Sequence, residues 1–323
     1  MNIRYLSRAD VESLNISMAQ VIEVVEEGFR LKGMGQTQMP PKTAIHARPG
    51  ETFLHAMPAY VGGMDTAAIK WVGGNENNPK RGLPNISGVI VLNDPETQFP
   101  ICIMDAGWVT MMRTGAANAV GMKYLGPQCA ETVAVIGCGV QGRSNALAMH
   151  THYPEIKQLR CYDVSAEALG AFVKEAEQAY DSEVVAVNGP REAVEGADVV
   201  VTAGPSPKSP TPYLRQEWLK AGAMAAPVDY MGAWEGELAA KVDKLITDDH
   251  GQMEYYRSKG YFADVPKPYA DLGEIVAGKQ PGRESADERT MSILMGIAID
   301  DAVTAQLIYD QACEQEVGVM LSR

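Results

Sequence analysis

The chain of 323 residues carries 41 acidic and 28 basic side chains, which gives a formal net charge of −13. This balance argues against a protein that binds the phosphate backbone of nucleic acids, because such proteins need clustered positive charge to displace counterions. It leaves anionic small molecules open, since a few local cations can override the overall sign. The length favours two domains and easily provides a sizeable core.

Neither the cysteines nor the histidines show the spacing of a metal site. Five of each are scattered along the chain, with no CxxC pair and no paired Cys/His ligands. We therefore expect no metal and no disulfide framework. The first residues contain no apolar signal-like core, and no run approaches about 18 apolar residues. These features predict a protein of the reducing cytoplasm without a membrane segment.

The first third of the chain predicts a mixed α+β unit. A helix opens at Ser17 and continues through MAQVIEVVEEGFRLKGMG, in which apolar residues recur at helical spacing. Short strands separated by turns follow over residues 40–104, namely TAIHA, TFLHAMPAYV, AAIKWVGG, SGVIVLND and FPICIMD. A second helix, WVTMMRTGAANAVGMKYLG, follows Asp105 and ends at Gly126.

The middle of the chain alternates strands with helices, which is the pattern of a doubly wound parallel sheet. TVAVIGCG is a continuous apolar run, as expected for a strand that is buried on both faces. Further strands are expected at RCYD, VVAV, DVVVTAG, GAMAAPVD and KLITDD, with helices such as SAEALGAFVKEAEQAY between them. A last helix is expected from about Asp287 to Cys313. The fold class is α/β, with a Rossmann-type sheet beside the α+β unit.

A glycine loop of the form GxGxxG follows the strand TVAVI and opens a helix, which is the context that dinucleotide binding requires. Gly137 and Gly139 allow a tight turn and close approach of a pyrophosphate, and Gly142 allows the helix to pack on the strand. Asp163 lies 21 residues after Gly142, where an acid that binds the ribose is expected. Residues 164–166 contain no cation for a 2′-phosphate, so NAD is favoured over NADP. The alternative is a glycine turn in another nucleotide-binding or ligand-free α/β fold.

Three cations stand at unusual places in the N-terminal unit. Lys70 lies inside the apolar strand AAIKWV, Arg113 in the middle of a helix rich in small residues, and Lys42 after two prolines. Lysine and arginine are seldom fully buried unless they are paired. Taken singly, each is explained by a side chain that reaches the surface or pairs with an acid. Together they would suit a carboxylate, which Arg113 could bind through two hydrogen bonds.

Asp229 is a candidate acid/base because it follows the apolar run AMAAPV at the carboxyl end of an expected strand. Ligands bind at these strand ends in open α/β sheets. Burial would raise the pKa of this carboxyl group and suit it to proton exchange with an amine. A helix N-cap or turn aspartate before Met231 explains the local sequence equally well.

Several segments occur together here as they do in one known family. They are Ala56-Met57-Pro58-Ala59-Tyr60, Lys70 followed by Gly73-Gly74-Asn75, Arg113-Thr114-Gly115-Ala116-Ala117, the glycine loop with Gln141, Asp163, Asp229, and Gly282-Arg283. The chain therefore resembles the ornithine cyclodeaminase/mu-crystallin family, which also contains archaeal-type alanine dehydrogenases and ketimine reductases. The resemblance runs essentially from end to end, and RTGA and the glycine loop are its most specific parts.

The resemblance implies a homodimer. Residues 1–128 would form a substrate-binding and dimerisation domain, completed by a C-terminal helix at about 300–323. Residues 129–299 would form an NAD-binding Rossmann domain inserted between these two parts.

The resemblance also implies roles for individual residues. Lys42, Lys70 and Arg113 would hold the α-carboxylate of the substrate, and Asp229 would be the general acid/base. Further contacts to the substrate would come from His55, Met57, Met295 and Gly296. Contacts to NAD would come from Gly137, Gly139, Val140, Gln141, Gly142, Asp163, Thr114, Asn85, Thr202 and Val228.

The family's reactions share hydride transfer at the α-carbon of an amino acid. In ornithine cyclodeamination as the family runs it, NAD takes hydride from the α-carbon of L-ornithine to give an imine. The δ-amine attacks the imine, ammonia leaves, and the same hydride returns from the reduced cofactor to give L-proline. We expect NAD-dependent hydride transfer at the α-carbon of a small L-amino acid, with ornithine cyclodeamination as the first candidate reaction. The alternatives are an alanine-type amino-acid dehydrogenase, a cyclic imine reductase, and a non-catalytic binding protein of the mu-crystallin kind. The joint presence of Lys70, Arg113 and Asp229 argues against the last of these.

Two positions depart from the family's pattern. His55 stands where the bacterial ornithine enzyme has a glutamate near the distal amine of the substrate. Ala233 stands where a lysine usually follows the catalytic aspartate by four residues and contacts the cofactor. Both departures argue against ornithine as the substrate, and they leave hydride chemistry at an amino-acid α-carbon in place.

Overall fold

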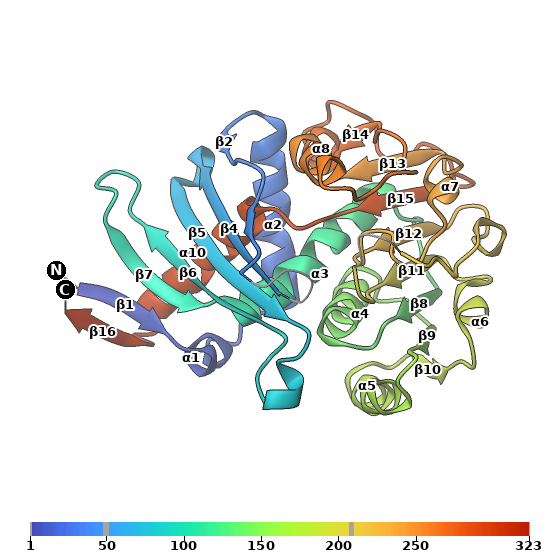
Figure 1. Cartoon of the computed structure of the whole chain (residues 1–323), viewed down its shortest axis with the longest axis horizontal. Helices are drawn as coiled ribbons and strands as arrows, with labels where there is room; N and C mark the ends of the chain where they lie inside the picture. Colours follow the sequence, from blue (N-terminus) through green and yellow to red (C-terminus); the bar gives the residue numbers. More distant parts are fainter. Residues whose placement is uncertain (1, 48–51, 207–209, 323) are drawn as a thin grey trace. The chain divides into compact units, whose positions relative to one another are not determined.

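The computed structural model describes residues 2–47, 52–206 and 210–322, and the chain folds into two compact units (Figure 1). The first unit comprises Met1–Arg113 and Gly296–Arg323, and the second comprises Thr114–Met295. These boundaries differ from the expected ones near residues 128 and 299. The reason is that helix α3 (Ala106–Leu125) begins in the first unit and ends in the second.

The first unit contains a mixed sheet whose strands run in the spatial order β16-β1-β7-β6-β5-β4-β2, with β3 paired to β4. Its pairs are antiparallel except for β1 and β7, which are parallel. The strands are β1 (Asn2–Leu6), β2 (Thr37–Gln38), β3 (Thr43–Ile45), β4 (Thr52–Val61), β5 (Thr66–Asn75), β6 (Ile86–Asn93), β7 (Pro100–Asp105) and β16 (Val319–Ser322).

Two long helices, α2 (Met18–Gly33) and α10 (Ala298–Glu314), lie together, and α10 packs on β4, β5 and β6 (Figure 1). The predicted start of α2 is confirmed, because Ser17 and Gln20 form a reciprocal capping box. Gly28 allows close packing, since a Cβ atom there would lie 3.1 Å from Ile299 Cγ2. The remaining helical segments of this unit are α1 (Arg8–Ser13), η1 (Gly62–Met64) and η2 (Pro79–Arg81).

The sheet face opposite α10 is apolar. The strand register aligns one row of side chains across six strands, and each of them is half-buried or exposed: Pro58, Ile69, Val91, Ile103, Tyr5 and Val319. A second row joins Ala56, Trp71 and Val89, of which Trp71 and Val89 are each 39% exposed. An open apolar face of this kind is typical of an interaction surface.

The second unit contains a parallel sheet in the order β10-β9-β8-β11-β12-β15-β13-β14. The order in which strands are added reverses between β8 and β11: β9 and β10 extend the sheet on one side of β8, and the later strands extend it on the other. This position is the switch point of a Rossmann fold. The strands are β8 (Thr132–Ile136), β9 (Gln158–Tyr162), β10 (Glu183–Ala186), β11 (Val199–Thr202), β12 (Met224–Pro227), β13 (Lys244–Thr247), β14 (Ala270–Asp271) and β15 (Thr290–Ile293). The predicted fold class is confirmed.

The helices of the second unit alternate with these strands. They are α4 (Val140–His152), α5 (Ala166–Ala179), α6 (Pro190–Val194), η3 (Gln216–Trp218), α7 (Gly236–Ala239), α8 (His250–Ser258) and α9 (Leu272–Val276). In the described part of the chain, no helix combines the length and the apolar character needed to cross a membrane.

The end of the chain differs from two predictions: a helix over 287–313 from the sequence pattern, and a C-terminal helix at about 300–323 from the resemblance. Residues Thr290–Ile293 form β15, whose side chains are all buried between β12 and β13, and α10 begins only at Ala298. After α10, the chain turns at Gly318, whose φ is +96°, and β16 pairs with β1. A short buried strand and a buried helical turn have similar apolar patterns, which explains the difference.

Candidate active site

A buried ionic cluster lies in the first unit, between β5, α3 and α10. Lys70 is 1% exposed and Arg113 is 7% exposed, and both contact the carboxylate of Asp301, which is itself 1% exposed. Lys70 Nζ lies 2.6 Å from Asp301 Oδ1, and Arg113 Nε lies 3.0 Å from the same oxygen. Lys70 Nζ also donates to Thr110 Oγ1 at 3.4 Å. The structure therefore brings two of the three predicted cations together.

The guanidinium of Arg113 is contacted at Nε by Asp301 and at Nη1 by the backbone of Gly296. Its Nη1 and Nη2 atoms donate to none of the residues that the structure describes. The backbone of Gly296 lies against it, because a Cβ atom at Gly296 would be 2.2 Å from Nη1. Gly296 also has a φ of +79°, so both the backbone conformation and the adjacent guanidinium require glycine. The two Nη atoms are the pair that a planar carboxylate would bind.

Lys42 and His55 lie close to this ionic cluster. Lys42 is 5% exposed, and its Nζ donates to the carbonyl oxygen of Gly296 at 3.4 Å. His55 lies on β4 and stacks on Phe53 with ring centroids 4.5 Å apart. Burial, followed by the charges of Lys42 and Lys70, lowers the pKa of His55 to about 3. His55 is therefore neutral near pH 7.

The charge state of Lys70 is set by opposing effects. Burial lowers its pKa most strongly, Asp301 raises it, and Arg113 and Lys42 lower it, which leaves the pKa at about 7. An anion that enters the pocket would stabilise the ammonium form by the same electrostatic effect as Asp301.

The glycine loop of the second unit has the geometry that its sequence predicts. Gly137 has a φ of +99°. A Cβ atom at Gly142 would lie 2.0 Å from Gly137 O and 3.1 Å from Val135 Cγ1, so this glycine lets α4 approach β8. At Gly139, the N-cap of α4, the same atom would meet nothing within 4 Å. Gly137 is thus required by its backbone conformation and Gly142 by packing, whereas Gly139 leaves open space at the helix N-terminus.

Asp163 follows β9 and is hydrogen-bonded to the glycine loop. Its carboxylate accepts from the backbone amides of Cys138 at 2.7 Å and Ser165 at 2.8 Å. These bonds orient the side chain beside the loop. Val140 is 61% exposed and Val164 is 91% exposed.

The contacts of the RTGAAN segment of α3 explain its composition. Arg113 serves the ionic cluster, and a Cβ atom at Gly115 would lie 2.5 Å from Ser144 Oγ, so glycine lets α3 pack against α4. Asn118 Nδ2 donates to Asn145 Oδ1 at 2.9 Å, and Asn145 Nδ2 donates to the carbonyl of Gln141. The helix that carries Arg113 is therefore tied to the helix that follows the glycine loop.

Asp229 is 2% exposed at the end of β12, in a backbone turn where Tyr230 and Met231 have φ values of +54° and +66°. Non-glycine residues pay strain for such angles. The carboxylate accepts from Thr202 Oγ1 at 2.9 Å and from backbone amides that include Gly232 and Ala233. Burial raises its pKa most strongly and these hydrogen bonds lower it, so the pKa is about 6. This value suits a group that both takes and returns a proton.

The other predicted site residues are distributed between the units. In the first unit, Met57 pairs with Lys70 in the sheet register, and Asn85 is exposed in the loop before β6. In the second unit, Thr114 is 8% exposed on α3, the Val228 amide donates to the carbonyl of Thr202, and the Met295 carbonyl accepts from the Tyr230 hydroxyl. Ala233 is 1% exposed within an apolar core.

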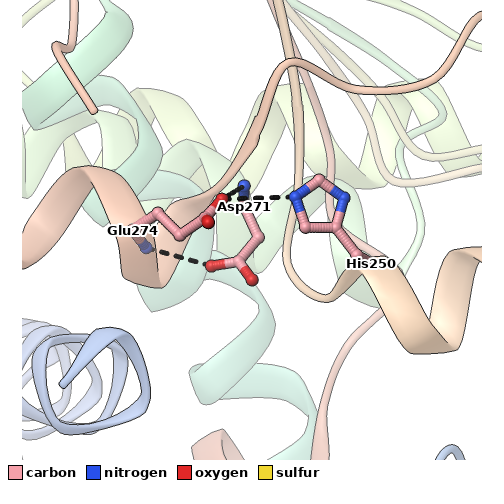
Figure 2. A group of neighbouring side chains, drawn as sticks. All are labelled: His250, Asp271 and Glu274. Carbon is pink, nitrogen blue, oxygen red and sulfur yellow. Dashed lines mark hydrogen bonds and ion pairs between the residues drawn. The ribbon is translucent and has the colours of Figure 1, made fainter. Parts of the chain in front are cut away.

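A group of three potential metal ligands lies elsewhere in the second unit (Figure 2). The ligand atoms of His250, Asp271 and Glu274 all lie within 4.8 Å of one another. Asp271 and Glu274 form the capping box of α9, and Glu274 Oε2 lies 3.2 Å from His250 Nε2. These hydrogen bonds already account for the arrangement, so we assign no metal to it.

Asp301 is the residue of the ionic cluster that sequence reasoning missed. A signal was present, because Asp300 and Asp301 interrupt the otherwise apolar run AIDDAV at the start of α10. Acids are seldom buried in such a helix unless they are paired. The sequence provided no means of pairing Asp301 with Lys70, which lies 231 residues earlier.

The fold and these features define an α/β protein whose second unit is of the Rossmann type and whose first unit holds a buried cluster of cations. The model of the ornithine cyclodeaminase/mu-crystallin family matches residues 2–316, and the chain belongs to this family.

The chain is similar to known proteins over nearly its whole length. It is 36% identical to an alanine dehydrogenase of Archaeoglobus fulgidus, covering 98% of each chain. Its fold matches a Δ1-pyrroline-2-carboxylate reductase of Thermococcus litoralis in complex with NADH and L-proline, with a TM-score of 0.88, 32% identity and coverage of 98% and 99%. It also matches an archaeal alanine dehydrogenase dimer with bound NAD, with a TM-score of 0.87, 33% identity and coverage of 100% and 99%.

The glycine loop predicts a contrast between two substitutions. Gly142→Ala should lower the free energy of unfolding by about 1–3 kcal/mol, because the new methyl group meets the backbone of Gly137. Gly139→Ala should change it far less, since its φ is −78° and no atom lies within 4 Å of the new carbon. Urea denaturation of both variants tests this. Equal effects would contradict the packing role of Gly142.

Proposed function

We propose that this protein is an NAD-dependent enzyme that transfers hydride at the α-carbon of a small L-amino acid or of the corresponding imine. The observation that carries the proposal is the Arg113 guanidinium. It is 7% exposed and held at Nε by Asp301, and its two Nη atoms donate to none of the described residues. A buried guanidinium oriented in this way is suited to a carboxylate.

The glycine loop fits the pyrophosphate of NAD. Gly139 leaves open space at the N-terminus of α4, where the backbone amides and the helix dipole favour phosphate. Gln141 Oε1 is buried and accepts no hydrogen bond from the described residues, so it is available to a ligand. We propose that Gly137, Gly139, Val140, Gln141 and Gly142 hold the phosphates. Asp163 would accept from the ribose hydroxyls.

The bound cofactor would accept or donate the hydride, and the protein would supply orientation and a proton carrier. Lys42, Lys70 and Arg113 would fix the α-carboxylate and thereby the position of the α-carbon. Asp229, with its pKa at about 6, would take a proton as the α-amine is converted to an imine and would return it in the reverse direction.

Among the reactions of this class, neutral His55 favours a dehydrogenase or imine reductase. A protonated side-chain amine, such as that of ornithine, would gain no ion pair from an uncharged imidazole beside Lys42 and Lys70. The named relatives support the same choice, since one is an alanine dehydrogenase and another a pyrroline-2-carboxylate reductase. Ornithine cyclodeamination, the reaction expected from the sequence, is the second candidate, and the family model supports it.

A substrate screen tests the proposal. L-amino acids with NAD, and cyclic imines or 2-oxo acids plus ammonia with NADH, are followed by NADH absorbance and by ammonia release. A dehydrogenase accumulates NADH in proportion to product. A cyclodeaminase releases ammonia from L-ornithine without net NADH. Absence of turnover with every substrate in both directions would contradict the proposal.

Arg113→Ala should lower kcat/KM on the order of 100-fold or more, because it removes the charged fork that binds the carboxylate. NADH affinity, measured by fluorescence titration, should remain nearly unchanged. Arg81→Ala is the matched control, since Arg81 is exposed in the same unit. Loss of NADH binding in the Arg113 variant would argue against a principal role in holding the carboxylate.

The pH profile of kcat/KM for amino-acid oxidation should have two limbs, which report groups of the free enzyme. Activity should rise through about pH 6, because Asp229 must lose its proton before it can accept one. Activity should fall above about pH 7, as Lys70 loses the charge that attracts the carboxylate. Asp229→Asn should remove the acid limb from the residual activity. An acid limb that persists unchanged would exclude Asp229 as its origin.

We also propose that the protein forms a homodimer through the open sheet face of the first unit. The two apolar rows lie opposite α10 and include Trp71 and Val89, each 39% exposed. A second copy could cover both rows by twofold symmetry. The similar archaeal alanine dehydrogenase structure is a dimer, which supports this assembly.

Trp71→Glu should shift the protein from dimer to monomer, because it places a charge in the middle of the apolar face. Met34→Glu is the control, since Met34 is an exposed apolar residue at the end of α2, a helix packed against α10. Light scattering coupled to size-exclusion chromatography measures both masses. A Trp71 variant that remains dimeric would place the interface elsewhere.

A further inference from the structure

We propose that Asp301 is a positioning residue of the substrate pocket, whose single oxygen Oδ1 holds Lys70 and Arg113 in the arrangement that receives a carboxylate. This inference rests on the proposed function. Asp301 itself would not touch the substrate, because it acts through the two cations that it contacts.

The geometry supports a shared anchor. Asp301 Oδ1 accepts a hydrogen bond from Lys70 Nζ at 2.6 Å and forms an ion pair with Arg113 Nε at 3.0 Å that lacks hydrogen-bond geometry. Asp301 Oδ2 is buried and forms no hydrogen bond with the described residues. If Lys70 and Arg113 each formed a separate ion pair with Asp301, both carboxylate oxygens would be used. Because both cations contact the same oxygen, a displacement of one cation alters the contact that holds the other.

The position of each contact on Arg113 is also informative. Asp301 lies on the Nε side, and the Gly296 backbone lies against the Nη1 side, so the guanidinium is restrained by α10 and by the residue that leads into it. The side chain of arginine has many rotamers, and their loss on binding is unfavourable. Restraint in the free protein removes that cost before a substrate arrives.

Neutralisation of buried charge is a simpler explanation of Asp301, and it makes different predictions. The charged groups that shift the pKa of Lys70 are Asp301 from α10, Arg113 from α3 and Lys42 before β3. Of these, Asp301 alone raises the pKa of Lys70. His55 from β4 also faces Lys70, whose charge lowers the pKa of the imidazole. A residue that served only folding would leave substrate affinity unchanged in any variant that folds.

The test is Asp301→Asn, which keeps the shape of the side chain and removes its charge. With the best substrate of the screen, KM should rise on the order of 30-fold, while kcat should fall much less and NADH affinity should not change. The alkaline limb of kcat/KM should also move to lower pH, because Lys70 loses the group that raises its pKa. Asp310→Asn is the matched control, an exposed acid on the same helix.

A second readout does not require turnover. The titration of Lys70 Nζ is followed by NMR in protein labelled with nitrogen-15 lysine, and the resonance is assigned by its absence in Lys70→Arg. Its midpoint should be lower in Asp301→Asn than in the unsubstituted protein and unchanged in Asp310→Asn. If the unsubstituted protein turns over no amino or imino acid, the proposed function fails, whereas this titration separately tests whether Asp301 sets the charge state of Lys70.

An unchanged KM in folded Asp301→Asn would overturn the proposal, whether or not the Lys70 midpoint moves, because neutralisation of charge alone predicts that result. If that variant does not fold, Asp301→Glu replaces it, since the charge is kept while the oxygen is displaced. A raised KM in folded Asp301→Glu supports positioning, and a normal KM overturns it. Failure of both variants to fold would assign Asp301 to folding alone and would overturn the proposal as well.

Discussion

The burial of positive charge in the first unit is the constraint on which the candidate site depends. A buried ammonium and guanidinium would each cost several kcal/mol if left unpaired. One carboxylate, that of Asp301, lies within 3.0 Å of both Lys70 and Arg113. When Lys70 is protonated, one negative charge faces two positive ones, and the three groups then keep a net attraction for an anion. The stability of the fold and the affinity for a carboxylate thus come from the same few contacts.

Helix α3 shows how packing and chemistry share one short segment. Arg113 needs a place beside Asp301, whereas Gly115 and Asn118 connect the same helix to α4. Along a helix, residues two and five positions apart point in different directions, so one turn and a half can meet these separate requirements. This explains why RTGAAN combines an arginine with small residues and an amide.

The fold and much of the candidate site could be predicted from the sequence because their signals are local. The buried run of β8, the glycine loop and Asp163 lie within a short stretch, and each obeys a rule of backbone conformation or strand burial. The partner of Lys70 could not be predicted, since Asp301 contacts it only after α10 packs on the sheet. The same reason applies to β1 and β16, whose pairing joins the two ends of the chain. Substrate choice depends on space around His55, which residue identities do not specify.

Gly296 gives the pocket a marker that can be recognised in sequence alone. Its Cα lies beside Arg113, and the Cβ atom of any larger residue at this position would be 2.2 Å from the nearest guanidinium nitrogen. A related chain that keeps the arginine but replaces this glycine cannot hold the same carboxylate-binding arrangement. The residue at the position of Gly296, just before α10, would therefore distinguish family members that retain this carboxylate-binding arrangement from those that lack it.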